Sequence, residues 1–138
     1  MASQAQVARV GGRARTIGWV LSGLMIAFLL VDAAMKLVAL PVVLETGAPL
    51  GFPGAAMARG LGVLLLACTL LYAWPRTAVL GAILLTGYLG GAVATHVRVG
   101  DPLFTHILFG VYMGVLLWLG LYLRDARLRA LVPLRGVG

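Results

Sequence analysis

Four long apolar stretches, separated by short segments rich in glycine, proline and charge, make up most of the chain. They cover residues 17–40, 55–74, 77–97 and 103–123. An α-helix of about 20 apolar residues is long enough to cross the hydrocarbon core of a bilayer. The pattern therefore predicts an all-α protein, built as a bundle of four transmembrane helices.

The segments between these stretches have the composition of turns. Residues 42–54 are rich in glycine and proline, which interrupt helices. Pro75-Arg76 separates the second and third stretches, and Gly100-Asp101-Pro102 separates the third and fourth. Asp101 is expected to cap the last helix, with Pro102 as its first residue. The bundle, residues 17–123, is then flanked by basic segments at residues 1–16 and 124–138.

Positive charge is divided unequally between the two sides of the predicted bundle, because four spans place both termini on the same side. Eight of the 11 Lys and Arg residues lie on that side: Arg9, Arg13, Arg15, Arg76, Arg124, Arg127, Arg129 and Arg135. The other side has three: Lys36, Arg59 and Arg98. The positive-inside rule therefore places the N-terminus and the C-terminus in the cytoplasm.

Composition and charge support a membrane environment. Hydrophobic residues make up 62% of the chain and charged residues 11%, against about half and about a quarter in soluble domains. The net charge of +7 is explained by topology and by contact with anionic lipid headgroups, so we expect the lipid bilayer, and no nucleic acid, as a partner. The single cysteine, Cys68, cannot form a disulfide within the chain and is expected to be a packing residue.

Charged residues inside the first stretch are the first candidates for chemistry. Asp32 and Lys36 are four residues apart and share a helix face. A carboxylate at this depth is costly against lipid, so Asp32 is expected to face the bundle, with Lys36 or Arg59 as its partner. The pair fits two roles equally well: a structural ion pair, or the floor of a binding pocket or proton site.

A second polar group lies near the turn between the third and fourth helices: His96, Arg98, Asp101 and His106. Topology places this group on the same side as Asp32, which predicts a polar cavity opening outward, whereas the cytoplasmic half is expected to be almost purely apolar. Arg98 also fits an interfacial anchor. The ten-residue spacing of the two histidines matches no recognised ligand pattern, so no metal site is predicted.

Tyrosines and glycines complete the candidate residues. Tyr88 and Tyr112 lie at mid-membrane depth, where their hydroxyls need partners, and either is suited to line the cavity. Two small-xxx-small pairs lie on the third and fourth helices: Gly87 with Gly91, and Gly110 with Gly114. Such pairs allow close approach of helices in lipid, either within the monomer or across the face of a homo-oligomer.

Several short motifs together resemble the DoxX-like family of bacterial four-helix membrane proteins. They are Asp32 before Lys36, Leu50-Gly51-Phe52-Pro53, Pro75-Arg76-Thr77, Leu80-Gly81-Ala82, Gly87-Tyr88 with Gly91-Ala92, Ala94-Thr95-His96-Val97-Arg98 and Gly100-Asp101-Pro102. The resemblance covers roughly residues 17–124. It implies a multi-pass protein of the bacterial inner (plasma) membrane.

The resemblance also implies classes of ligand and partner. Relatives resemble a membrane subunit of thiosulfate:quinone oxidoreductase, and others are tied to oxidative-stress complexes or to assembly of partner membrane proteins. A quinone or lipid-like amphiphile is thus the implied ligand, and a membrane or redox protein the implied partner. The resemblance assigns no catalytic residue, and whether the chain is an enzyme is left open.

Three functions are consistent with these features. In the first, a redox-linked subunit binds a quinone or similar amphiphile: Asp32 and His96 exchange protons, Lys36 and Arg59 tune them, and a tyrosine contacts the ring. In the second, the chain is a non-enzymatic accessory or assembly protein. In the third it is a small transporter, which is disfavoured because Lys36 neutralises the carboxylate that proton exchange requires.

Overall fold

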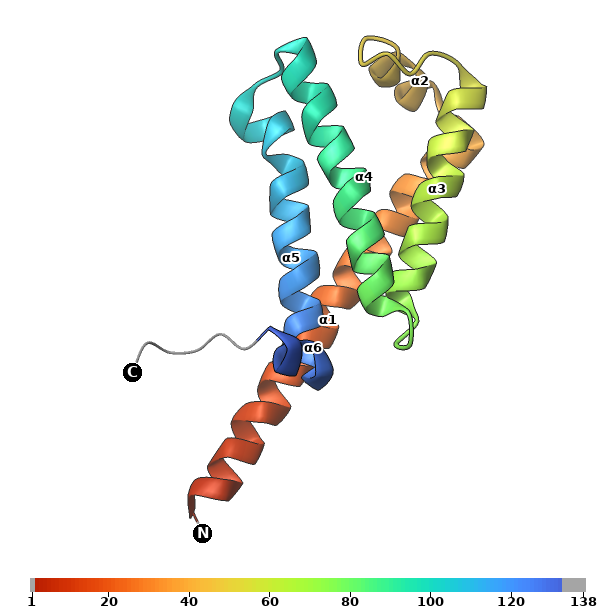
Figure 1. Cartoon of the computed structure of the whole chain (residues 1–138). Helices are drawn as coiled ribbons and strands as arrows, with labels where there is room; N and C mark the ends of the chain where they lie inside the picture. The colour runs from red at the N-terminus through yellow and green to blue at the C-terminus, as the bar shows by residue number, and fades with distance from the viewer. Residues whose placement is uncertain (1, 133–138) are drawn as a thin grey trace.

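The structure, a computed structural model, describes residues 2–132, with side chains from Gly11 onward (Figure 1). The side chain of Arg9 and the whole of Arg135 lie outside the described residues, so the predicted basic segments are only partly described. The elements, in chain order, are α1 (Ala2–Val38), α2 (Pro41–Gly47), α3 (Ala55–Ala73), α4 (Ala78–Val99), the π-helical turn η1 (Leu103–Ile107), α5 (Phe109–Arg124) and α6 (Ala126–Leu131).

Four of the helical segments are long and apolar enough to cross a membrane: Gly11–Val38, Ala55–Ala73, Ala78–Val99 and Leu103–Arg124. Between residues 2 and 132 every regular element is helical. The prediction of an all-α, four-span bundle is therefore confirmed. The cytoplasmic placement of the termini stays a prediction from the charge distribution.

The helix ends differ from the expected boundaries in three places. Helix α1 begins at Ala2 rather than near residue 17, since no proline interrupts the polar segment before the span. Pro41 follows the end of α1, as expected, but it also lies in the first turn of the short helix α2. A backbone N–H in the first turn has no partner within the helix, so its absence in proline costs nothing there. The predicted cap at Asp101 is wrong: Pro102 precedes η1, and no side chain caps that turn.

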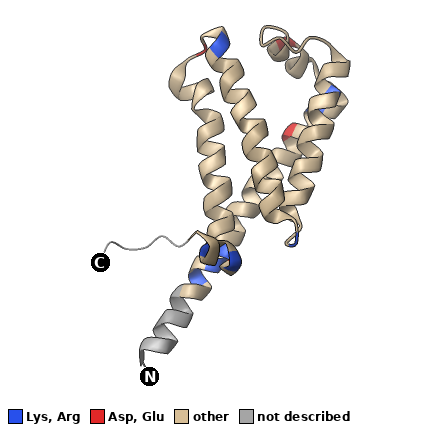
Figure 2. Cartoon of the chain, viewed as in Figure 1, with Lys and Arg blue, Asp and Glu red and all other residues tan. Residues whose placement is uncertain are grey.

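The four spans pack as a closed ring, in which α1 contacts α3 and α5, and α4 contacts the same two helices from the other side. We call the end near α6 and the α3–α4 turn the basic end, and the end near α2 and η1 the open end. Arginines gather at the basic end (Figure 2), those described being Arg13, Arg15, Arg76, Arg124, Arg127 and Arg129.

Close backbone contacts hold the basic end together. A Cβ on Gly81 would lie 2.2 Å from the backbone nitrogen of Tyr72, so α3 and α4 touch through their main chains. A Cβ on Gly18 would lie 2.8 Å from the carbonyl oxygen of Gly120, so α1 and α5 do the same. Only glycine permits this approach. Toward the open end the helices diverge, and α4 and α5 separate from α1 and α3 (Figure 1).

Candidate functional site

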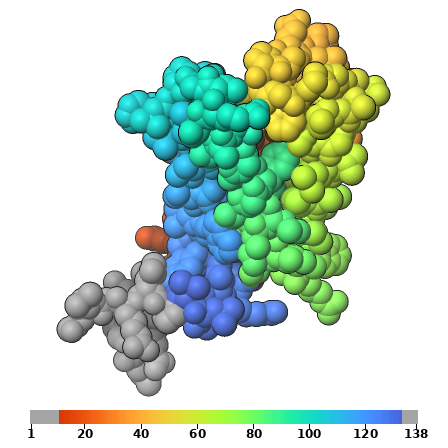
Figure 3. Space-filling model, turned by 45° about the horizontal axis from the view of Figure 1, so that its top comes forward, coloured from red at the N-terminus to blue at the C-terminus, as the bar shows by residue number. Residues whose placement is uncertain are grey.

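A cavity of ≈ 670 Å³ fills the space between the diverging helices at the open end. Side chains of α1, α3, α4 and α5 line it, and α2 covers it from above. Figure 3 shows a hollow in the surface between α4 and the α2–α3 region. Most of the lining is apolar, and the polar side chains in it are Asp32, Lys36, Thr46, Tyr88, Thr95, His96 and His106.

Asp32 and Lys36 form the ion pair that the sequence predicts. Helix α1 places them one turn apart, and the Lys36 Nζ donates a hydrogen bond to Asp32 Oδ1. The two side chains are 35% and 19% exposed, respectively, and both line the cavity. Arg59 is not the partner of Asp32, because its Nε donates instead to the carbonyl oxygen of Leu37, at 3.2 Å, and its side chain is exposed.

The histidines approach one another at the opposite wall. Their rings are 5.8 Å apart between centroids, so His96 of α4 faces His106 of η1. The Nδ1 of His96 lies 2.5 Å from Oδ2 of Asp101. Since a carboxylate accepts hydrogen bonds, the ring donates through Nδ1, and Nε2 is the nitrogen left for a ligand. Asp101, expected to cap a helix, thus orients His96 instead.

Arg98 links the end of α4 to a loop at the rim of the cavity. Its Nη2 donates to the carbonyl oxygen of Leu50, at 2.7 Å, and so ties the end of α4 to the loop between α2 and α3. Gly51 in that loop has a φ of +89°, and a Cβ there would lie 2.8 Å from Arg98 Nη2. The glycine both adopts the turn and leaves room for the guanidinium. Arg98 therefore acts on the rim and does not line the cavity.

The two candidate tyrosines have different positions. Tyr88 lines the cavity and is half-buried. Tyr112 does not line it: the residue is 46% exposed on the outer face of α5. The reason is helical phase, since Met113, the next residue, occupies the inward position.

The glycine pairs also separate into two environments. Gly87 and Gly91 line the cavity, and a Cβ on either would meet nothing within 4 Å. Gly110 is in tight contact, because its Cβ would lie 3.1 Å from the carbonyl oxygen of Leu89. Gly110 thus packs α5 against α4 within the monomer, whereas Gly114 has only the Leu89 side chain near it, 4.0 Å from its Cβ position. The first pair leaves a gap beside α4 on the side of α3.

Exposed leucines line the cavity on the side of this gap. Leu64 of α3 and Leu84 of α4 both line the cavity, and both are exposed. Gly87 lies beside Leu84 with no side chain to fill the space. The cavity lining therefore includes exposed apolar side chains of both α3 and α4.

The expectation of an almost purely apolar cytoplasmic half is wrong, because polar side chains are buried there. Tyr72, fully buried, donates its hydroxyl proton to the carbonyl oxygen of Leu117 at 2.7 Å. Ser22 lies 3.0 Å from the same hydroxyl and therefore donates to it. The signal in the sequence was a serine inside a long apolar run, a position at which a hydroxyl in lipid needs a partner.

The cavity can hold an amphiphile with a polar head. Its volume lies within the usual range for small-molecule sites, about 300–1,000 Å³, and its lining combines apolar walls with a few convergent polar groups. Lys36 and Tyr88 offer hydrogen-bond donors to carbonyl or hydroxyl oxygens, and Nε2 of His96 offers an acceptor to a hydroxyl group. Within the described residues, no group of three or more His, Cys, Asp or Glu side chains is arranged to hold a metal ion.

Comparisons with known proteins agree with this architecture. A profile of the DoxX-like family matches residues 20–120, which is most of the chain and overlaps all four spans. No curated protein and no solved structure gives a significant match. The matched region begins inside α1, ends inside α5 and contains every polar residue of the cavity. The chain therefore belongs to the DoxX-like family.

Proposed function

We propose that this protein binds a lipid-like amphiphile, with a quinone as the first candidate, in the cavity at the open end. The observation that supports this most strongly is the combination of exposed, cavity-lining leucines on α3 and α4 with the Asp32–Lys36 pair inside a largely apolar cavity. An amphiphile would enter from the bilayer between these two helices. Apolar walls suit an isoprenoid or acyl tail, and the polar groups suit a head with oxygen atoms.

The polar residues would have distinct tasks toward such a head group. Lys36 and Tyr88 would donate hydrogen bonds to its oxygens, and Nε2 of His96 would accept one from a hydroxyl of the head group. Asp32 and His96 are groups in the cavity that can accept or release a proton. A quinone, when bound, would supply the two-electron redox chemistry. Because Arg59 and Tyr112 lie outside the cavity, they have no place in this proposal.

Orientation and partners belong to the same proposal. With the basic end in the cytoplasm of a bacterium, the cavity lies in the outer half of the inner membrane. Relatives in the DoxX-like family resemble a membrane subunit of thiosulfate:quinone oxidoreductase, so the partner of this chain would be a protein that exchanges electrons with the bound amphiphile.

The test is a titration of purified protein with a short-chain benzoquinone, followed by native mass spectrometry. We expect saturable binding at micromolar concentrations. Binding should weaken about tenfold or more in Asp32→Asn and in Gly87→Leu, which would remove a charge and fill the gap. Tyr112→Phe is the matched control, since that tyrosine faces outward, and it should bind as the wild type does. Unsaturable uptake, or equal weakening in the control, would refute the proposal.

A groove between α4 and α5 favours a second candidate function, that of an accessory or assembly protein. The groove has a volume of ≈ 640 Å³, is lined almost entirely by apolar and small residues, and includes Gly90, Gly110, Gly114 and Trp118. Small residues allow a helix of another protein to approach closely. A photo-crosslinker at Gly90 should then capture one dominant membrane protein in native membranes, whereas one at Val63, exposed on α3, should not.

A further inference from the structure

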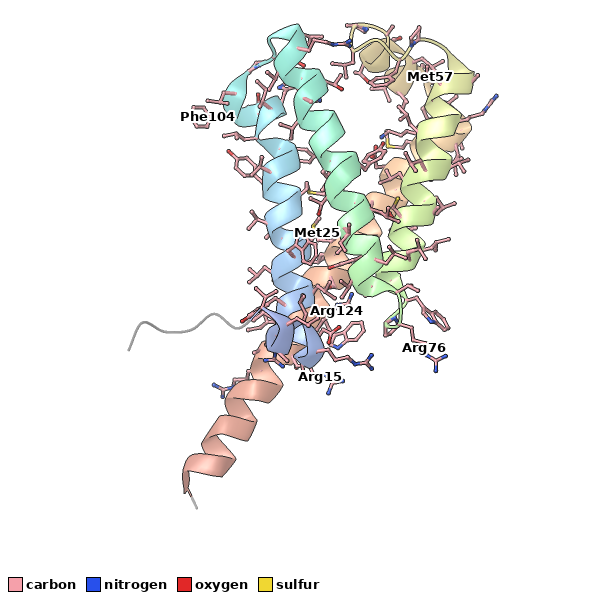
Figure 4. The ribbon with its side chains drawn as sticks, viewed as in Figure 1. Arg15, Met25, Met57, Arg76, Phe104 and Arg124 are labelled. Atoms are coloured by element: carbon pink, nitrogen blue, oxygen red, sulfur yellow. The ribbon has the colours of Figure 1, made fainter. Side chains whose placement is uncertain are left out.

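A second hollow, ≈ 290 Å³, lies at the basic end and has a different chemistry from the cavity. Residues of α1, α5 and α6 and the start of α4 form its walls. Its charged lining consists of Arg15, Arg124, Arg127, Arg129 and Asp125, with Trp19 beside them. Figure 4 shows Arg15 and Arg124 next to α6, and Arg76 apart from them on the α3–α4 turn.

Arg124 is the unusual member, because a charged side chain only 7% exposed carries no carboxylate partner among the described residues. Its Nη2 donates to the carbonyl oxygen of Tyr72 at 3.2 Å, and its Nε has no hydrogen-bond partner. The guanidinium carbon lies 4.4 Å from the ring centroid of Trp19 and 5.1 Å from that of Tyr72. These contacts offset only part of the free-energy cost of burying a cation. A bound anion would offset the rest.

The remaining charges around the hollow also favour an anion. Four arginines face one carboxylate there. That carboxylate, Asp125, is already engaged, since its Oδ1 accepts a hydrogen bond from the backbone nitrogen of Arg127 at 2.9 Å. Among the described residues Asp125 forms no ion pair with Arg124, and one carboxylate against four guanidinium groups leaves the hollow with an excess of positive charge.

We propose that this hollow binds the phosphate of an anionic phospholipid headgroup. A guanidinium presents paired donors that match phosphate oxygens. The hollow lies where α5 ends and α6 begins, beside the exposed ring of Trp19, which is the depth at which headgroups and interfacial aromatics meet in a bilayer. Pro75 and the ring of Trp19, both exposed in the lining, supply an apolar wall for the glycerol and upper acyl carbons. This depth and apolar wall favour a lipid over free phosphate.

The proposal differs from a general attraction of basic proteins to anionic membranes. A diffuse effect depends on total charge, so every arginine at the basic end would contribute similarly. A built site depends on the arginines that line the hollow. Arg76 lies at the same end, exposed, and does not line it. Removing Arg76 changes the net charge by the same amount as removing Arg127 or Arg129, so it is a matched control.

The experiment uses the full chain in mild detergent and native mass spectrometry with added phosphatidylglycerol or phosphatidylcholine of identical acyl chains. We expect one phosphatidylglycerol to bind at least about tenfold more tightly than phosphatidylcholine. Arg127→Gln and Arg129→Gln, each as a single substitution, should each clearly reduce this preference, and Arg124→Gln should do the same if it folds. Arg76→Gln should keep the preference.

Three outcomes would overturn the proposal. Equal binding of the two lipids would mean that the hollow does not select an anionic headgroup. A loss of preference in Arg76→Gln equal to that in the Arg127 and Arg129 variants would leave only diffuse attraction. Inorganic phosphate at millimolar concentration is the second arm: if it binds as one saturable ion that phosphatidylglycerol does not displace, the hollow is a site for free phosphate and the lipid assignment is wrong.

Discussion

Removing the hydroxyl of Tyr72 tests whether the polar contacts at the basic end stabilise the bundle. This hydroxyl joins three helices, because it lies on α3, donates to the Leu117 carbonyl of α5 and accepts from Ser22 of α1. Tyr72→Phe keeps the ring and loses both hydrogen bonds. The side chain is 0% exposed, so no solvent molecule replaces them.

The expected loss can be worked out from these contacts. Interhelical hydrogen bonds in membranes contribute about 0.6 kcal/mol on average and about 1.7 kcal/mol at most. Two such bonds are lost, and the Ser22 hydroxyl keeps only weaker alternatives within its own helix. We therefore expect the free energy of unfolding to fall by about 1.5–2.5 kcal/mol.

The assay is reversible unfolding in mixed micelles, followed by circular dichroism or steric trapping. Tyr112→Phe serves as the control, because that tyrosine is exposed on α5 and makes no described hydrogen bond, and its stability should stay within about 0.3 kcal/mol of the wild type. In a double-mutant cycle, Ser22→Ala should cost less in the Tyr72→Phe background than alone. If Tyr72→Phe and Tyr112→Phe have equal stabilities, the reasoning is refuted.

Three other substitutions probe separate features. Asp32→Asn should lower the free energy of unfolding by about 1–2 kcal/mol, because Lys36 loses its partner in a partly exposed site, and adding Lys36→Met should restore most of it in the same unfolding assay. Gly81→Ala should cost more than about 2 kcal/mol through overlap with the facing backbone, whereas Gly23→Ala, with open space around it, should be neutral or stabilising by up to about 1 kcal/mol; equal melting temperatures would contradict this. Arg98→Gln should barely change stability but should accelerate amide hydrogen exchange in residues 48–54, and unchanged exchange would remove the proposed tie at the rim.

The four spans could be predicted from the sequence, because a helix that crosses a bilayer needs about 20 consecutive apolar residues. The same reasoning identified the partner pair Asp32 and Lys36, since both lie on one helix at a fixed spacing. Contacts between different helices were harder to predict. The sequence places Arg98 near the membrane interface, but it does not predict that its guanidinium donates to the carbonyl oxygen of Leu50. That contact depends on how a loop folds back over the bundle, which no periodicity records.

Helical phase and local turns explain the remaining differences. Tyr112 has the right depth for the cavity but the wrong face, because one residue along a helix is a rotation of about 100°. Asp101 is a residue type that often caps helices, yet its carboxylate accepts a hydrogen bond from His96 across the turn. The π-helical turn at Leu103–Ile107 shifts the start of the last span, and π-turns have no clear sequence signature.

The contrast between the two ends of the bundle has a consequence for how such a protein diversifies. Where main chains touch, as at Gly81 and Gly120, any larger residue disturbs two helices at once, so these positions have little freedom to drift. Along the gap between α3 and α4, positions such as Leu64 and Leu84 face open space, and side chains there can be exchanged without moving the scaffold. The same helix bundle can in this way acquire new ligand preferences through substitutions at the open end alone.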